Sequence, residues 1–255
     1  MTYKFKKALL RNPSKSISSA ISSRGLKPNF GKVVDEQNSY IDALINSGLK
    51  VHILDAIEEF PDSIFIEDPA IVYENYCVLL RPGTMSRFGE SKALESEVKK
   101  YFDQVYLVKE GKIEGGDILR INDHFIIGLS NRTDIKGAEN LSYVLKKLGA
   151  TVEISKTPEG VLHFKSDCSL IDEETILLTK LMSKLEIFEK KYRIIEIPEG
   201  EEVAANSLRV NSKLLVPKGF NRTYEKLSKN YDLLTLDVSE ISKVDAGLSC
   251  MSLRW

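Results

Sequence analysis

Three side chains that could carry out covalent catalysis lie far apart in the sequence: Cys250, His163 and Glu114. A cysteine thiolate is a strong nucleophile, and a neighbouring cation favours its formation by lowering the pKa of the thiol. A histidine can donate a proton to a departing amine and then take one from an attacking water. Together with carboxylates, this set suits attack on a planar, cationic carbon.

Acidic residues that could hold such a cation come before an apolar run. Asp62, Glu67 and Asp68 lie there, and Glu114 is followed by two glycines. Carboxylates bind a guanidinium through paired hydrogen bonds, and glycines allow a ligand to approach the backbone closely. The sequence therefore predicts one small cavity surrounded by these groups.

Each of these residues also has an ordinary structural interpretation. A lone cysteine in an apolar segment, such as 248–253, is more often a buried core thiol. His163, between a leucine and a phenylalanine, is more often a structural histidine, and the Glu67-Asp68 pair could be a solvated turn. The catalytic interpretation gains weight because all of them fall at equivalent edges of a repeat.

The repeat consists of a polar anchor followed by two apolar runs with a polar turn between them. The anchors Asp68, Asp117, Asp167 and Asn206 are spaced by 49, 50 and 39 residues. Each pair of runs is typical of a β-hairpin, with turns such as 74–75 and 122–123. The start of each hairpin's first strand should point toward a common centre.

Helices and further strands follow most of the hairpins. Apolar periodicity predicts helices over 36–46, 91–102 and 137–148, and strands over 51–54, 105–108, 152–154, 194–197, 233–236 and 248–253. A ββαβ unit repeated about five times cannot bury its own sheet and must close on itself. The expected fold is therefore an α/β, five-bladed, propeller-like ring that forms one domain over residues 1–255.

Composition and spacing argue against several classes of function. The net charge is −1 with no basic stripe, so nucleic acid is not an expected partner. No apolar run is long enough to span a bilayer or to form a signal peptide, which favours a cytoplasmic protein. The three cysteines form no disulfide pattern, and Cys77 and Cys168 are expected in the core. Without CxxC or HExxH spacing, we expect no metal site from local ligands, which leaves open a set of ligands distant in the sequence.

Several stretches together resemble the bacterial dimethylarginine dimethylaminohydrolase family, within the guanidino-group-modifying superfamily. The most specific are residues 60–69, 81–87, 123–128, 161–165 and 249–254, and the similarity runs from 11 to the end. The resemblance implies a five-bladed α/β propeller and hydrolysis of methylated arginines to citrulline without a cofactor. It also implies a small-molecule substrate, with a homodimer as a possible assembly.

The resemblance assigns roles to individual positions. It implies that Cys250 is the nucleophile, His163 the general acid and base, and Glu114 the carboxylate that orients the site. Glu67 and Asp68 match the positions that bind the guanidinium. Contacts to the amino-acid end of the substrate match Arg87 and Arg132 for the α-carboxylate, and Asp62 with the backbone carbonyls near Ile21 and Val244 for the α-amino group.

Other functions of the same superfamily remain open. Arginine deiminases usually carry an arginine where this chain has Glu67, and they contain an inserted helical bundle for which 255 residues leave no room. An amidinotransferase would also be longer. A non-catalytic binding protein with a similar ring is a third alternative, against which Cys250, His163 and Glu114 argue together.

Overall fold

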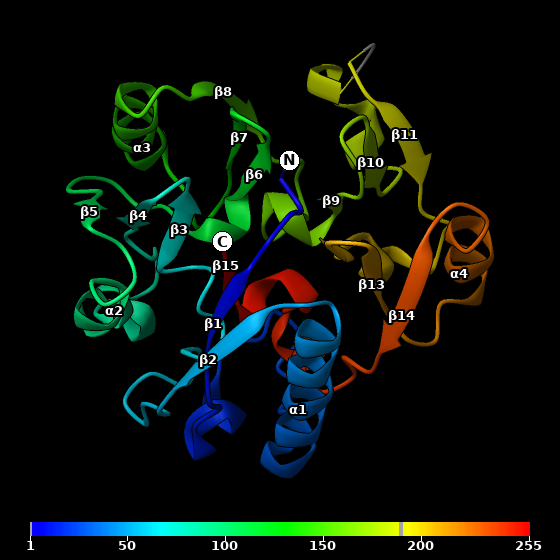
Figure 1. The fold of residues 1–255 in the computed structure, drawn as a ribbon, viewed down its shortest axis with the longest axis horizontal. Helices are drawn as coiled ribbons and strands as arrows, with labels where there is room; N and C mark the ends of the chain where they lie inside the picture. Colours follow the sequence, from blue (N-terminus) through cyan, green and yellow to red (C-terminus); the bar gives the residue numbers. More distant parts are fainter. Residues whose placement is uncertain (1, 189–190) are drawn as a thin grey trace.

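The computed structural model describes residues 2–188 and 191–255, which form five three-stranded sheets around a common centre (Figure 1). The strand orders are β15-β1-β2, β3-β4-β5, β6-β7-β8, β9-β10-β11 and β12-β13-β14. In each sheet an antiparallel pair is followed by a parallel third strand. The predicted five-bladed α/β propeller is confirmed.

Elements of the first three sheets have the following bounds: β1 Lys7–Arg11, α1 Phe30–Asn46, β2 Lys50–Leu54, β3 Ala70–Tyr73, β4 Tyr76–Leu79, α2 Glu90–Val98, β5 Gln104–Leu107, β6 Ile118–Ile121, β7 His124–Leu129, α3 Ile135–Lys147 and β8 Thr151–Lys156. The remaining elements are β9 Cys168–Leu170, β10 Thr175–Leu178, β11 Arg193–Glu196, β12 Leu208–Val210, β13 Lys213–Pro217, α4 Asn221–Leu227, β14 Asp232–Leu236 and β15 Leu253–Arg254. The α-helices lie on the outside of the ring (Figure 1).

Tight turns join the two antiparallel strands of three blades. Glu74, Asn122 and Asn211 have φ values of 51°, 55° and 54° at these turns. Positive φ matches the twist that a two-residue hairpin turn requires, and asparagine tolerates it better than most residues. The hairpins predicted at 74–75 and 122–123 are confirmed.

Helix boundaries differ from the predicted ones by a few residues. The helix expected over 36–46 begins at Phe30, where the Asn29 side chain accepts a hydrogen bond from the Lys32 backbone N–H at 3.1 Å. Asp134 caps α3 in the same way through Gly137. The helix expected over 91–102 ends at Val98, although its apolar face continues into the buried Phe102. Periodicity does not distinguish the last helical turn from a buried turn.

The first blade is built from both ends of the chain. Strand β1 pairs with β2 in parallel and with β15 antiparallel, so that Ala8 lies opposite Arg254. The strand predicted over 248–253 is wrong for most of its length, because Leu248–Met251 is a 3-10 helix and only Leu253–Arg254 is a strand. Residues three apart share a face of a 3-10 helix, and this turn buries Leu248 and Met251 together in the core.

Five apolar clusters occupy the joints between neighbouring blades. One cluster contains residues of the first and second blades, including Leu9 and Leu79. The next clusters join the second blade to the third, the third to the fourth and the fourth to the fifth. The last one contains Leu10 and Leu215, from the first and fifth blades. The apolar contacts thus run around the whole ring and close it. None of the described helices is both long and apolar enough to cross a membrane.

Candidate active site

The predicted reactive residues lie where the chain enters the inner strand of each blade. Asp68 precedes β3, and Glu114 precedes the 3-10 helix Gly115–Asp117 that leads into β6. His163 precedes the 3-10 helix Phe164–Ser166 that leads into β9. Potential ligand atoms of Asp68, Glu114 and His163 all lie within 4.8 Å of one another. The prediction that these edges converge is correct for this trio.

Three of the four repeat anchors, all but Asp167, hold these edges together. Side-chain oxygens of Asp68, Asp117 and Asn206 accept hydrogen bonds from backbone N–H groups beside the reactive residues, at 2.8–3.0 Å. The donors are Gly116, Phe164 and Ser249, in the same order, and each lies in the inner segment of another blade. The anchors identified from the repeat therefore position the segments of Glu114, His163 and Cys250.

His163 and Glu114 form a buried pair. His163 Nε2 lies 2.7 Å from Glu114 Oε2. The other carboxylate oxygen accepts from the Gly83 backbone N–H at 2.9 Å. Burial by itself would lower the pKa of His163, but the hydrogen bond to Glu114 and the charges of Asp68 and Asp117 raise the pKa to about 9. The imidazole is therefore a cation near neutral pH and carries a proton that it can donate.

The two glycines after Glu114 allow other parts of the chain to pack closely against this segment. A Cβ atom at Gly115 would lie 1.9 Å from the Glu67 carbonyl oxygen, and one at Gly116 would lie 2.7 Å from His163 Cγ. From the sequence, the glycines were expected to let a ligand approach the backbone closely. In the structure the space is occupied by the Glu67 backbone and the imidazole ring.

Cys250 lies next to the acidic residues and is half-buried. Its carbonyl oxygen accepts a hydrogen bond from the Glu67 backbone N–H at 3.1 Å. Burial and the charges of Glu67 and Asp68 raise the pKa of the Cys250 thiol to about 12. The thiol is therefore neutral in the free protein, and a cation placed beside these carboxylates would favour the thiolate. Cys77 and Cys168 are buried in the core, as predicted.

Asp68 is a fixed, ionised carboxylate. One oxygen is paired with Arg87, and the other accepts from the Gly116 backbone N–H at 3.0 Å. Although burial acts to raise the pKa of Asp68, the Arg87 guanidinium and the imidazolium of His163 lower it to about 2. Negative charge is therefore kept beside the histidine over the whole physiological pH range.

The two predicted arginines differ in how strongly they are engaged. Arg87 is buried and binds both carboxylate oxygens of Glu90 at 3.0 and 2.8 Å, in addition to Asp68 and the Phe65 carbonyl. Among the described residues, the Arg132 guanidinium makes only long hydrogen bonds, at 3.4 Å, to Glu114 Oε1 and to the Thr84 hydroxyl. The guanidinium of Arg132 is thus the more available of the two for a ligand carboxylate.

Glu90 was missed by the sequence analysis. Its spacing from Arg87, three residues, is the signal that could have found it, since such pairs meet on one helical face. Burial raises the pKa of Glu90 to about 7 against the opposing effect of Arg87.

Hydrogen bonds connect the segments of the three residues predicted to bind the α-amino group. The Ile21 backbone N–H donates to Asp62 Oδ1 at 3.1 Å. The hydroxyl of Ser22 donates to the Lys243 carbonyl at 2.6 Å, which brings the segment of Ile21 against that of Val244. The structure thus brings all three residues into neighbouring segments, and their roles in binding stay predictions.

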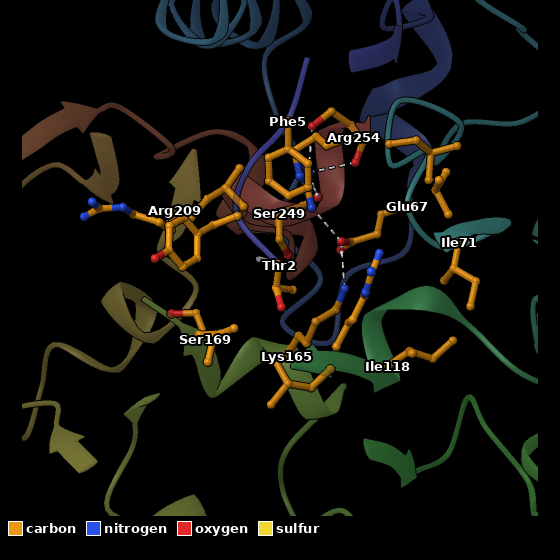
Figure 2. Close-up of a pocket in the computed structure, with 18 of the residues that line it drawn as sticks. Thr2, Phe5, Glu67, Ile71, Ile118, Lys165, Ser169, Arg209, Ser249 and Arg254 are labelled. Atoms are coloured by element: carbon orange, nitrogen blue, oxygen red, sulfur yellow. Dashed lines mark hydrogen bonds and ion pairs between the residues drawn. The ribbon is translucent and has the colours of Figure 1, made fainter. Parts of the chain in front are cut away.

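Glu67 is held by two cations to which the sequence analysis assigned no role. Lys165 Nζ and Arg254 Nη2 lie 2.7 and 3.1 Å from Glu67 Oε1. Figure 2 shows the three side chains converging at a cavity of about 150 Å³ that Ser169 and Arg209 also line. Glu67 Oε2 is buried and has no hydrogen-bond partner among the described residues.

A metal could be held by Asp68, Glu114 and His163, according to their spacing alone. The convergence of these residues was predicted, but their potential as metal ligands was not, because the three come from different blades and have no local ligand spacing. Arg87 already binds Asp68, and Arg132 and the protonated His163 contact Glu114. These positive charges disfavour a metal ion at the same place.

Comparisons with known proteins agree with this geometry. A family model described as arginine deiminase matches residues 56–184. The N(G),N(G)-dimethylarginine dimethylaminohydrolase of Pseudomonas aeruginosa is 36% identical over 98% of this chain and all of its own length. The Streptomyces coelicolor enzyme of the same name is 30% identical over 98% of this chain and 96% of its own.

Solved structures extend the comparison. A mutant of the Pseudomonas aeruginosa enzyme complexed with citrulline superimposes with a TM-score of 0.96, at 34% identity over 99% of this chain and 100% of its own. The N-terminal domain of ArgZ, an arginine dihydrolase, gives 0.84 at 17% identity over 97% of this chain and 96% of its own, and shows the shared fold. The similarity to the curated enzymes covers nearly the full length, so the chain belongs to the dimethylarginine dimethylaminohydrolase family.

Proposed function

We propose that this protein hydrolyses Nω-methylated arginines to citrulline and an amine. The substrates would be asymmetric dimethylarginine and monomethylarginine, and the released amines dimethylamine and methylamine. The observation that carries the proposal is the buried ion pair of His163 and Glu114, which lies beside Asp68. The neighbouring residue Glu67 donates its backbone N–H to the Cys250 carbonyl. These residues would supply the acid, the cation site and the nucleophile of the reaction.

Binding of the substrate would activate the nucleophile. The guanidinium would be held by Glu67 and Asp68, whose charges raise the pKa of the Cys250 thiol in addition to the effect of burial. A bound cation offsets this negative charge and lowers the pKa of the thiol. Cys250 would then lose its proton only when the substrate is present.

Two covalent steps complete the reaction. The thiolate attacks the guanidinium carbon, and the C–N bond to the methylated nitrogen breaks as His163 gives that nitrogen a proton. A Cys250-bound amidino intermediate remains. The neutral His163 then takes a proton from water, the hydroxide attacks the same carbon, and the C–S bond breaks to give citrulline and restore the thiolate. Glu114, at 2.7 Å from Nε2, would hold the imidazole through both steps.

Arginine deiminase activity is the main alternative. The match of residues 56–184 to the arginine deiminase family favours it. Glu67, where those enzymes usually have arginine, argues against it, and Phe65, in the apolar cluster that Cys250 packs against, could accommodate methyl groups. Hydrolysis of another substituted arginine, or binding without catalysis, would use the same acidic residues, Glu67 and Asp68.

A citrulline assay separates these alternatives. Purified protein would be tested with asymmetric dimethylarginine, monomethylarginine and arginine, with Cys250→Ser as the inactive control. We expect kcat/KM for both methylated substrates to exceed that for arginine. An equal or larger value for arginine would identify a deiminase. No citrulline from any of the three would contradict the proposal and leave hydrolysis of another substituted arginine or binding without catalysis.

Three further expectations stay predictions. A single catalytic domain over residues 1–255 predicts one cooperative unfolding transition. A homodimer would be detected by light scattering of the purified protein. A cytoplasmic location would be tested by fractionation of the cells that make it.

A further inference from the structure

We propose that Lys165 and Arg254 are positioning residues that hold the Glu67 carboxylate ready for the substrate guanidinium. The inference rests on the proposed function, because it assigns Glu67 to substrate binding. It gives a role to two cations that lie outside the acid, base and nucleophile of the reaction.

The carboxylate of Glu67 is asymmetric in its contacts. Oε1 receives both cations, at 2.7 Å from Lys165 Nζ and 3.1 Å from Arg254 Nη2 (Figure 2). Oε2 is buried and has no partner among the described residues. A buried carboxylate oxygen without a donor is costly, and native structures normally satisfy such atoms. A guanidinium N–H of the substrate supplies the missing donor.

The backbone of Glu67 is fixed on two sides. Its N–H donates to the Cys250 carbonyl at 3.1 Å. Its carbonyl packs so closely against Gly115 that a Cβ there would lie 1.9 Å away. The remaining freedom is rotation of the side chain, and the two cations remove it by binding Oε1. Lys165 and Arg254 thereby decide where Oε2 lies.

The two cations come from the two catalytic segments. Lys165 follows His163 by two residues, within the 3-10 helix Phe164–Ser166. Arg254, in β15, also donates from Nη1 to the Ser249 carbonyl at 3.0 Å and to the Ser252 hydroxyl at 2.7 Å. Replacement of Arg254 would therefore disturb the turn that carries Cys250. Lys165 is the cleaner probe, because its ammonium group is paired with Glu67 and its other hydrogen bond, from Asn206, is accepted by the backbone carbonyl.

Steady-state kinetics of Lys165→Met provide the first test. Since a charge-assisted hydrogen bond is lost, kcat/KM for asymmetric dimethylarginine should fall about ten-fold to a hundred-fold, mainly through KM. Lys165→Arg should restore most of the loss, because it retains the charge. Lys213→Met is the matched control and should behave as wild type, because Lys213 on β13 forms an exposed ion pair with Asp232 on β14. Unfolding midpoints establish that the variants fold. If Lys165→Met does not fold, Lys165→Gln takes its place.

A double-mutant cycle asks whether Lys165 acts through Glu67. In a Glu67→Gln background, Lys165→Met should change kcat/KM by less than about three-fold, since the positioned charge is already absent. The proposal is overturned if Lys165→Met has wild-type kinetics, or if the two losses multiply in the double variant.

A binding measurement tests the positioning role independently of the proposed hydrolytic activity. Asymmetric dimethylarginine would be titrated calorimetrically into Cys250→Ser, with and without Lys165→Met. About ten-fold weaker binding in the double variant supports positioning even if the wild type releases no citrulline, in which case only the proposed function fails. Unchanged binding would overturn the positioning role even if hydrolysis is observed.

Discussion

His163 Nε2 and Glu114 Oε2 lie 2.7 Å apart, and the two side chains are 9% and 0% exposed. They come from the third and fourth inner edges of the ring, 49 residues apart in sequence. A charged hydrogen bond shielded from water is stronger than one at the surface. The pair therefore keeps the imidazole protonated and fixes its orientation for proton transfer.

Turnover should depend on pH through this pair. Because burial is outweighed by Glu114 and the nearby aspartates, the pKa of His163 is raised to about 9. We expect kcat to fall as the pH rises through about 9, where the proton for the leaving amine is lost. In Glu114→Gln the fall should move toward the ordinary pKa of about 6.5. A pH profile of kcat that is unchanged in this variant would contradict the role of the pair.

Folding stability should respond to the same proton. A pKa higher in the folded protein than in the unfolded chain stabilises the fold fully below about pH 6.5, and this contribution is lost as the pH rises through about 9. Urea unfolding should therefore show a gap between wild type and His163→Gln that narrows from pH 6.5 to 9. His124→Gln, at a half-buried histidine on β7 whose pKa is lowered by burial, is the control and should not change in this window. A constant gap would speak against a raised pKa.

Alkylation should reveal a neutral thiol at Cys250. Since burial, Glu67 and Asp68 raise the pKa of the thiol to about 12, the reaction with iodoacetamide should be slow at pH 7. Its rate should rise about ten-fold per pH unit up to pH 10, as the thiolate fraction grows. Glu67→Gln should react faster at each pH because one negative charge is removed. Peptide mass spectrometry locates the label, and a rate independent of pH would show that the thiolate is already formed.

Substitution of the two arginines should have different consequences. For Arg132→Ala we expect KM for methylated arginines to rise about ten-fold to a hundred-fold, because a charge-assisted contact to the α-carboxylate is lost. Methylguanidine, which has no carboxylate, should be unaffected. A similar loss for methylguanidine would remove the assignment.

Arg87→Ala should raise KM and also destabilise the protein. It leaves Asp68 and Glu90 buried without their cation, and such a loss costs about 3–5 kcal/mol. The free energy of unfolding, measured by urea titration, should therefore fall for Arg87→Ala and much less for Arg132→Ala. Equal stability of the two variants would contradict the buried network.

Much of this architecture could be predicted from local sequence features. The spacing of Asp68, Asp117 and Asn206 reflects a repeated unit, and hairpin turns, helix periodicity and the need to bury each sheet point to a closed ring. The same spacing places Glu114 and His163 at equivalent positions of the repeat, because each comes shortly before an anchor, Asp117 or Asp167. The family resemblance then predicts the reaction, hydrolysis of methylated arginines.

Long-range geometry was decided by tertiary structure. The Leu248–Met251 turn is a 3-10 helix rather than a strand, because burial of Leu248 and Met251 outweighs local preference. Lys165 and Arg254 meet on one oxygen of Glu67 because their segments come together only when the ring closes. Glu90 and Arg87 are close in sequence, but the burial of their ion pair also depends on the folded ring. The raised pKa of His163 and that of Cys250 have the same origin, since burial and neighbouring charges depend on distances through space. Residue order along the chain determines the repeat, whereas the electrostatic environment of the site exists only in the folded ring.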